Sequence, residues 1–377
     1  MAPLLDIRDL RIEATIRAPG QPPREAVIVD GVSLRLERGK VLGLIGESGA
    51  GKSTIGLSAL AWGRGGIRLS GGEIRLNGRE IRTAAPAEWR KLRGREVTYV
   101  AQSAAAAFNP AKRLMEQVIE ATLHHGVMGR AEAEARAVAL FRTLSLPNPE
   151  TFGQRYPHQV SGGQLQRAMT AMALCPRPDL VVFDEPTTAL DVTTQIDVLA
   201  AIKTAIAQTG VAALYIPPDR AVVAQVADEI LVLRHGKAVE LGATAQILSA
   251  PREAYTRALV SVRQIDHAEQ PPGSAPVLAL TGVSARYGAM TQDVLSDITL
   301  ALHPGQTLAL VGESGSGKST VARVVTGLLP PRAGDIRFNG APLPPRLERR
   351  STDQLRRIQM IYQMADVAMN PRQTVRT

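Results

Sequence analysis

The chain has 377 residues, 45% of them hydrophobic, so it is long enough for two or three domains with sizeable cores. Its apolar runs are far shorter than the roughly 20 residues of a membrane-spanning helix, the N-terminus lacks the pattern of a signal peptide, and a single cysteine, Cys175, excludes an intrachain disulfide and indicates a reducing cytoplasm. The net charge of +9 would suit a nucleic acid, but the basic residues are scattered and aromatic residues make up only 3%, which argues against a nucleic-acid partner.

The first strand that we single out covers residues 40–45, a short apolar run that ends in a glycine-rich loop, as is typical of a buried parallel strand. The loop has the pattern G-x-x-x-x-G-K-[ST]. Backbone N–H groups of such a loop converge on phosphate oxygens, the lysine reaches the β and γ phosphates, and the next hydroxyl binds Mg²⁺. We therefore predict ATP and Mg²⁺ here, with Ser53 on the metal and the nucleotide bound by Gly46, Ser48, Gly49, Gly51, Lys52, Ser53 and Thr54.

Helices and an acidic strand end follow along the chain. Residues 113–146 and 195–208 predict helices, and an apolar run between them ends in Asp184 and Glu185. With a phosphate loop upstream, Asp184 is predicted to hold Mg²⁺ through water and Glu185 to polarise the attacking water. Strands that alternate with helices predict an α/β fold.

Three segments of the chain recur in the same order, at offsets of 266, 262 and 261 residues. The repeats pair residues 46–54 with 312–320, 72–78 with 334–340, and 100–102 with 361–363. Such a regular offset indicates a duplicated domain of about 260 residues.

The repeat sets the predicted boundaries. The first copy spans residues 1–264, a proline-rich linker spans 265–276, and the second copy spans 277–377. Residues 306–311 are predicted to form the strand before the second loop. The second copy lacks counterparts of everything beyond about residue 116, so we expect either a shortened gene product or a fragment. Its predicted nucleotide-binding residues are Gly312, Ser314, Gly315, Gly317, Lys318, Ser319 and Thr320, with Ser319 also on the metal.

Residues 160–164, Val-Ser-Gly-Gly-Gln, lie between the first phosphate loop and the acid pair. With this motif the whole chain resembles the ABC ATPase family. The resemblance implies an ABC-type P-loop NTPase domain, with a mixed sheet core and a helical lobe, duplicated with an incomplete second copy. It also implies that two domains pair head to tail, so that ATP held by one is contacted by four residues of the other: Ser161, Gly162, Gly163 and Gln164.

Other matched positions carry further roles in the family. Gln102 and Gln363 match the glutamine that senses Mg²⁺ and the membrane partner, so both are assigned to the metal and the nucleotide site, and Gln102 also to catalysis. Residues 109–110, 156–158 and 255–259 resemble the subfamily that imports di- and oligopeptides, nickel or glutathione. The resemblance implies two membrane-spanning permease subunits, indirectly a solute-binding protein, and a peripheral location at the cytoplasmic face of the bacterial inner membrane.

The chain departs from the family pattern at two side chains. Pro218 stands where the family has a switch histidine, so the first site is expected to bind ATP and hydrolyse it poorly, unless a displaced group substitutes. Tyr287, which lies 25 residues before Gly312, fits the aromatic residue that stacks on adenine, whereas the aligned position of the first copy is Ala14.

We therefore expect an ATP-binding and hydrolysing subunit that energises an importer of peptides or similar small solutes. One alternative is a degenerate ATP-binding module with little or no turnover, because Pro218 replaces histidine and the second copy has no signature or acid pair. Another is a soluble ABC ATPase of the ribosome or of DNA repair. That class would need a long charged linker helix or a coiled-coil insertion, and the sequence shows neither.

Overall fold

The computed structural model describes residues 2–16, 22–63, 65–188, 192–217, 220–261, 275–288, 291–312 and 315–362, together with residues 370 and 373. It divides into two compact units, Met1–Arg263 and Gln264–Thr377. Residues 265–274 of the predicted linker lie outside the described residues, so the limits of the linker stay a prediction.

An antiparallel sheet begins the first unit, with the strand order β2-β1-β4-β5. Along β1, Leu5 and Ile7 are fully buried in the core, whereas Arg8 and Asp9 are exposed. This partial alternation is expected of a sheet that is covered on one face only. The strands are β1 (Leu5–Ile16), β2 (Arg24–Leu36), β4 (Ile67–Leu76) and β5 (Arg79–Glu80).

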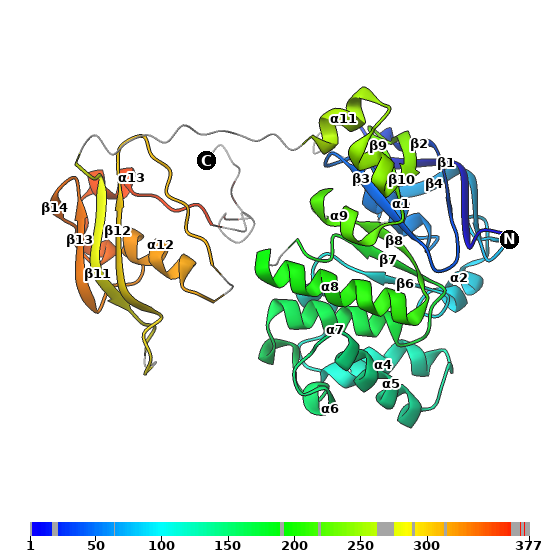
Figure 1. Ribbon diagram of the computed structural model, residues 1–377, viewed down its shortest axis with the longest axis horizontal. Helices are drawn as coiled ribbons and strands as arrows, with labels where there is room; N and C mark the ends of the chain where they lie inside the picture. Colours follow the sequence, from blue (N-terminus) through cyan, green and yellow to red (C-terminus); the bar gives the residue numbers. More distant parts are fainter. Residues whose placement is uncertain are drawn as a thin grey trace. The chain divides into compact units, whose positions relative to one another are not determined.

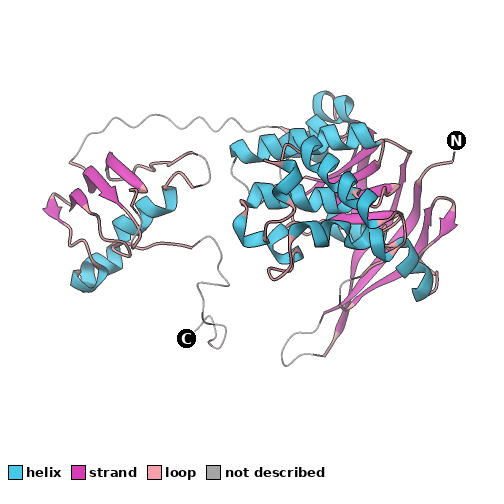
Figure 2. Cartoon of the chain, turned by 90° about the horizontal axis from the view of Figure 1, so that it is seen from below, coloured by secondary structure: helices cyan, strands magenta, loops and turns pink. Residues whose placement is uncertain are grey.

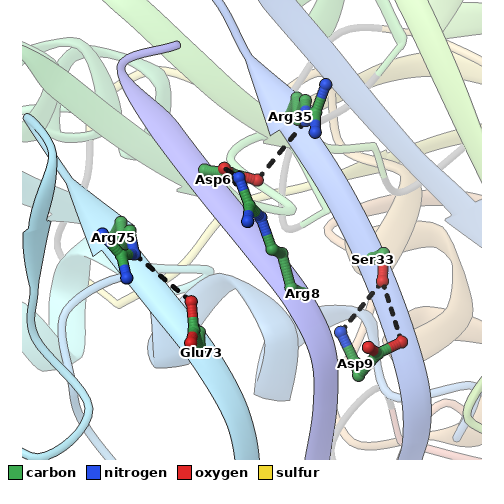
Figure 3. A network of polar contacts seen from close by, with 7 residues as sticks. All are labelled: Asp6, Arg8, Asp9, Ser33, Arg35, Glu73 and Arg75. Carbon is green, nitrogen blue, oxygen red and sulfur yellow. Dashed lines mark hydrogen bonds and ion pairs between the residues drawn. The ribbon is translucent and has the colours of Figure 1, made fainter. Parts of the chain in front are cut away.

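The other face of this sheet carries a network of charged side chains from β1, β2 and β4 (Figure 3). Asp6 lies 2.6 Å from the Arg8 guanidinium and 3.5 Å from that of Arg35. The hydrogen bond from Arg8 lowers the pKa of Asp6, against the opposing effect of burial. On the neighbouring strand, Arg75 pairs with Glu73 at 3.3 Å. Charged groups on this face therefore neutralise one another.

A second sheet forms the centre of the first unit, with the order β10-β9-β3-β8-β7-β6. Strand β3 lies between β8 and β9 and pairs with both in parallel. Strands β7 and β8 are buried along their whole length. One face of these strands packs against helices, and the other packs against the first sheet and the helix of residues 52–58. The strands are β3 (Val41–Gly46), β6 (Val97–Val100), β7 (Leu180–Asp184), β8 (Ala212–Ile216), β9 (Glu229–Arg234) and β10 (Lys237–Ala243).

Helices of the first unit gather in a lobe around α7, which packs against α3, α4, α5 and α8 (Figure 1). The helix predicted over 113–146 is two helices, α4 and α5, and the helix predicted over 195–208 is α8. No helix among the described residues is both long enough and apolar enough to cross a membrane. The helical bounds of the lobe are α3 (Ala104–Ala107), α4 (Leu114–His124), α5 (Arg130–Thr143), α6 (Pro149–Phe152), η1 (Pro157–Gln159), α7 (Gly162–Leu174) and α8 (Val192–Thr209). The remaining helices of the unit are α1 (Lys52–Ser58), α2 (Pro86–Leu92), α9 (Arg220–Val226), α10 (Thr244–Ser249) and α11 (Ala254–Val260).

The second unit repeats the antiparallel sheet, with the order β12-β11-β13-β14, and a helix that follows its phosphate loop (Figure 2). Val321 and Val324 of this helix pack with Leu280 and Val283 in one small core. The elements are β11 (Leu278–Ala285), β12 (Leu295–Leu302), α12 (Lys318–Thr326), β13 (Ala333–Phe338), β14 (Ala341–Pro342), η2 (Leu347–Arg349) and α13 (Thr352–Arg357).

The strand predicted over residues 306–311 is wrong. The structure gives these residues no secondary structure, and Val311 is 90% exposed. In the first unit, β3 is hydrogen-bonded to β8 and β9, which begin about 170 and about 190 residues after it. Among the described residues of the second unit none forms a counterpart of β8 or β9, so the apolar run lacks there the neighbours that a central strand needs.

Candidate nucleotide site

The first phosphate loop connects β3 to α1. Gly51 precedes the helix with a φ of +92°, a conformation that favours glycine. At Gly46, a Cβ would lie 2.3 Å from the backbone oxygen of Leu233, so only glycine lets the loop leave the sheet at this point. The backbone path of the loop therefore depends on the glycines that define the motif.

Lys52 bends back over this loop. Its Nζ donates hydrogen bonds to the backbone oxygens of Gly46 and Glu47, each at 2.9 Å. The loop surrounds a pocket of about 560 Å³, a size suited to a small-molecule ligand. The pocket is lined by Ile28, Ile45, Gly46, Glu47, Ser48, Gly49, Gly51, Lys52, Ser53, Thr54, Glu185 and Pro217.

The acid pair lies next to the loop, as the sequence predicts. Ser53 Oγ donates a hydrogen bond of 2.7 Å to Asp184 Oδ1, although 131 residues separate the two. Tyr99 OH donates to Asp184 Oδ2 at 2.6 Å. Asp184 is only 4% exposed, and these two donors satisfy both oxygens of the buried carboxyl group. The structure thus joins the phosphate-loop serine to the acidic strand end.

Glu185 is held by a separate set of contacts. Its backbone has a φ of +48°, an uncommon conformation for a residue other than glycine. Its backbone N–H donates to Ile216 O at 2.8 Å. Gln102 Nε2 and Thr188 Oγ1 each donate to Glu185 Oε2 at 3.0 Å. Gln102, predicted as a metal ligand, therefore contacts the second acid of the pair and not the first.

The signature residues begin α7. Gln164 N donates to Ser161 Oγ at 3.3 Å, and Ser161 N donates to Gln164 Oε1 at 3.2 Å, so the two residues form a capping box. A Cβ at Gly163 would lie 2.3 Å from the Thr194 methyl group, which explains the second glycine. Among the described residues that line the loop pocket, none belongs to positions 161–164. This geometry fits a signature that serves a nucleotide on another domain, and that role stays a prediction.

The second loop has similar local contacts. Lys318 Nζ donates to Gly312 O at 2.7 Å, as Lys52 does to Gly46. Tyr287 OH lies 3.2 Å from Thr320 Oγ1, and the Arg323 guanidinium donates to the same hydroxyl at 3.1 Å. The predicted stacking residue is therefore beside the second loop. Three residues singled out from the sequence lie outside the described residues: Ser314, Gln363 and Pro218.

Two features of the first site were missed from the sequence. One is Tyr99, whose only sequence signal is a hydroxyl-bearing aromatic residue near the end of a short apolar strand. The other is Ile28, a half-buried residue of β2 that lines the pocket. Neither position carries a motif, because both reach the site through packing between elements.

A family model described as ABC transporter matches residues 29–188 and again residues 295–377. The chain belongs to the ABC transporter family. The two matched stretches fall in the two structural units, so each unit carries ABC sequence.

Curated ABC relatives include the glutathione import ATP-binding protein GsiA. The Salmonella typhimurium LT2 protein is 35% identical over 393 aligned residues, which cover 92% of this chain and 62% of the relative. The Escherichia coli O157:H7 protein is 34% identical, over 94% of this chain and 64% of the relative. The chain thus spans somewhat less than two thirds of the length of these relatives.

Solved ABC structures show the same fold. A dimeric post-hydrolysis state of the ATP-binding cassette MJ0796, bound to ADP and Pi, has a TM-score of 0.55 at 22% identity and covers 64% of this chain and 98% of its own. The CbiO1 structure from Clostridium perfringens also has a TM-score of 0.55, at 18% identity, over 66% of this chain and 92% of its own. The predicted ABC-type mixed α/β fold with a helical lobe is confirmed.

Proposed function

We propose that the first unit binds ATP with its phosphates over residues 46–54. The observation that carries this proposal is the hydrogen bond between Ser53 and Asp184, which brings the phosphate loop and the acidic strand end to one edge of the pocket. Lys52 would exchange its two backbone acceptors for the phosphate oxygens, which are stronger acceptors because they are charged.

The oxygen atoms beside the loop fit Mg²⁺. Magnesium takes hydroxyl, carboxylate, phosphate and water oxygens and keeps several waters. The Ser53 hydroxyl and the Asp184 carboxylate supply two such groups, and within the described part of the chain no cluster of three or more His, Cys, Asp and Glu residues suits a different metal. Bound Mg²⁺ would offset negative charge on the phosphates.

Hydrolysis is assigned to the second acid. Gln102 and Thr188 both donate to Oε2 of Glu185, which holds the carboxylate at the pocket wall. We assign Oε1 to the attacking water. It accepts a proton as the water oxygen bonds to the γ phosphorus of ATP, while the bond from that phosphorus to the β–γ bridging oxygen breaks and leaves ADP and phosphate. Gln102 orients this base through its amide nitrogen, and its amide oxygen, which takes no part in that hydrogen bond, would be the atom that serves the metal.

At the level of the whole protein, the chain is the ATP-binding and hydrolysing subunit of an importer of peptides or similar small solutes. The similarity to the glutathione import proteins supports this. It would act at the cytoplasmic face of the inner membrane, on two permease subunits that receive solute from a binding protein. The dimeric MJ0796 structure and the position of Ser161 away from the pocket of its own unit favour head-to-tail pairing of ATP-binding domains.

Calorimetry with ATP and Mg²⁺ on the full chain tests the binding site. Lys52→Ala should weaken ATP binding by at least about 100-fold, because a cation that faces two phosphates makes hydrogen bonds among the strongest in proteins. Lys318→Ala is the matched control, and it should change the affinity of the first site less than about 3-fold, since the two loops are in separate units. An unchanged affinity in Lys52→Ala would refute the site.

A second function, ATP binding with little or no turnover, is favoured by Pro218 at the switch position. Pro218→His should then raise ATP turnover in the presence of a partner ATP-binding domain, and Glu185→Gln should lower it. A steady-state phosphate-release assay measures both. If the unaltered chain already turns over at about 1–100 s⁻¹, a range typical of phosphoryl-transfer enzymes, Pro218 is no obstacle.

A further inference from the structure

Tyr99 donates a hydrogen bond to the first acid of the pair, Asp184, and it belongs to none of the sequence motifs. It lies in β6, which pairs in parallel with β7, and in that pairing Tyr99 stands opposite Val182. Asp184 is two residues further along β7. The long side chain of tyrosine bridges this distance, and its hydroxyl reaches Asp184 Oδ2 at 2.6 Å.

The hydrogen bonds to Asp184 divide between its two oxygens. Ser53 donates to Oδ1 and Tyr99 donates to Oδ2. Both distances fall in the range of charge-assisted O–H···O⁻ bonds, which are about twice as strong as neutral ones. With one donor on each oxygen, rotation of the carboxylate about its Cβ–Cγ bond would break both bonds. Asp184 is therefore held with Oδ1 toward the phosphate-loop serine.

The ring of Tyr99 is fixed as well. It packs against the apolar cluster that contains Ile55 of α1 and Val182 of β7. A tyrosine with its ring in such a cluster and its hydroxyl on a polar group has little freedom left. The second unit offers a comparison, because Met360 takes the aligned position and a thioether has no hydrogen to donate.

We propose that Tyr99 is a positioning residue for the metal site of the first unit: it holds Asp184 in the orientation that Mg²⁺ bound with ATP requires. The inference rests on the proposed function. Groups that orient metal ligands in this way change metal affinity by about 10- to 100-fold when they are removed. Tyr99 would act on the metal through Asp184, to which its hydroxyl is hydrogen-bonded.

The test measures how much Mg²⁺ strengthens ATP binding, by calorimetry of the full chain with Mg²⁺ and with EDTA. Tyr99→Phe removes only the hydroxyl, and Tyr99→Met copies the second unit. Both should lower the gain in affinity from Mg²⁺ by about 10-fold, at the lower end of the range for such orienting groups. Affinity for ATP in EDTA should stay the same, because Lys52 and the loop are intact.

Each outcome decides the inference. If Mg²⁺ strengthens ATP binding by Tyr99→Phe as much as it does for the unaltered chain, the inference is overturned. A loss of affinity that is the same with Mg²⁺ and with EDTA, together with a lower melting temperature, would make Tyr99 a purely structural residue and would also overturn it. An unaltered chain that binds no ATP would overturn the proposed function itself, which is a different result.

Discussion

The two phosphate loops follow chain segments of similar sequence, but only one of the segments is a strand. In the first unit, Leu44 and Ile45 are 0% and 2% exposed. Their counterparts, Leu310 and Val311, are 44% and 90% exposed. The same holds for β6, where Val100 is fully buried and its counterpart Ile361 is 98% exposed.

This difference shows that a central parallel strand depends on its neighbours more than on its own sequence. β3 is paired on both sides, by β8 and β9, and both strands come from much later in the chain. The second unit keeps the antiparallel sheet because its strands pair with one another within residues 278–342. It also keeps the helix after the loop, α12, which packs on these strands. Strands that are close together in the sequence therefore still pair in the second unit. Its apolar run, residues 306–311, pairs with no strand among the described residues.

Proteolysis should give the largest contrast between the units. Brief treatment of the full chain with chymotrypsin should cut next to Leu308, Leu310 or Tyr362 at least about 100-fold faster than next to Leu44. An unpaired segment opens at almost no cost, whereas a central strand opens at a cost near the full 5–15 kcal/mol of a domain.

Mass spectrometry of the fragments over time measures this ratio. The first unit should persist while the second is degraded. If residues 306–311 and 361–362 resist the protease as well as residues 41–46 do, these two segments are paired in solution, and the comparison between the units fails.

Alanine substitutions at two aligned leucines, one buried and one exposed, should sharpen the comparison. Leu44→Ala should lower the free energy of unfolding of the first unit by about 2–5 kcal/mol, because it leaves a cavity in a packed core. Leu310→Ala should change the stability of the second unit by less than about 0.5 kcal/mol, as for an exposed side chain. Both tryptophans, Trp62 and Trp89, lie in the first unit, so their fluorescence in urea reports that unit alone.

Hydrogen exchange of β11 and β13 peptides reports the second unit in the same samples. A large loss of protection in Leu310→Ala would mean that this side chain is buried in solution.

The smallest effect concerns the charged face of the first sheet. Asp6 pairs across the strands with Arg35 and Arg75, whereas its counterpart Ala279 pairs with Ala301 and Arg337. Because the folded-state pKa of Asp6 is lowered, its contribution is complete above the unfolded value of about 3.9 and disappears as the pH falls through the lower folded value. Asp6→Asn should cost less than about 1 kcal/mol at pH 7, as for a pair whose arginine is exposed, and less at pH 2 than at pH 7.

Urea titrations at the two pH values, followed by tryptophan fluorescence, measure this difference. Ala279→Asn is the control, and it should show no dependence on pH. A cost of Asp6→Asn that is equal at both pH values would exclude the charge of Asp6 as its cause.

Much of the first site could be predicted from the sequence, because the phosphate loop and the acid pair are each formed by consecutive residues. The strand before the loop and the closeness of Ser53 to Asp184 followed from the two motifs. Tyr99 did not, because its role depends on the register between β6 and β7, which no local pattern encodes. Residues 306–311 were misjudged for a related reason, since an apolar run predicts a strand only where partner strands exist.

Glu185 has a left-handed backbone conformation, so the side chain that is proposed for hydrolysis stands at a position where glutamate lowers the stability of the fold. A φ of +48° costs a residue other than glycine on the order of 1 kcal/mol, which the surrounding structure must offset. Glycine at this position would relieve the strain, and asparagine would tolerate the conformation better than glutamate. Directed evolution for heat resistance alone should therefore enrich variants that have lost this carboxylate, and selection for ATP-driven growth should restore it.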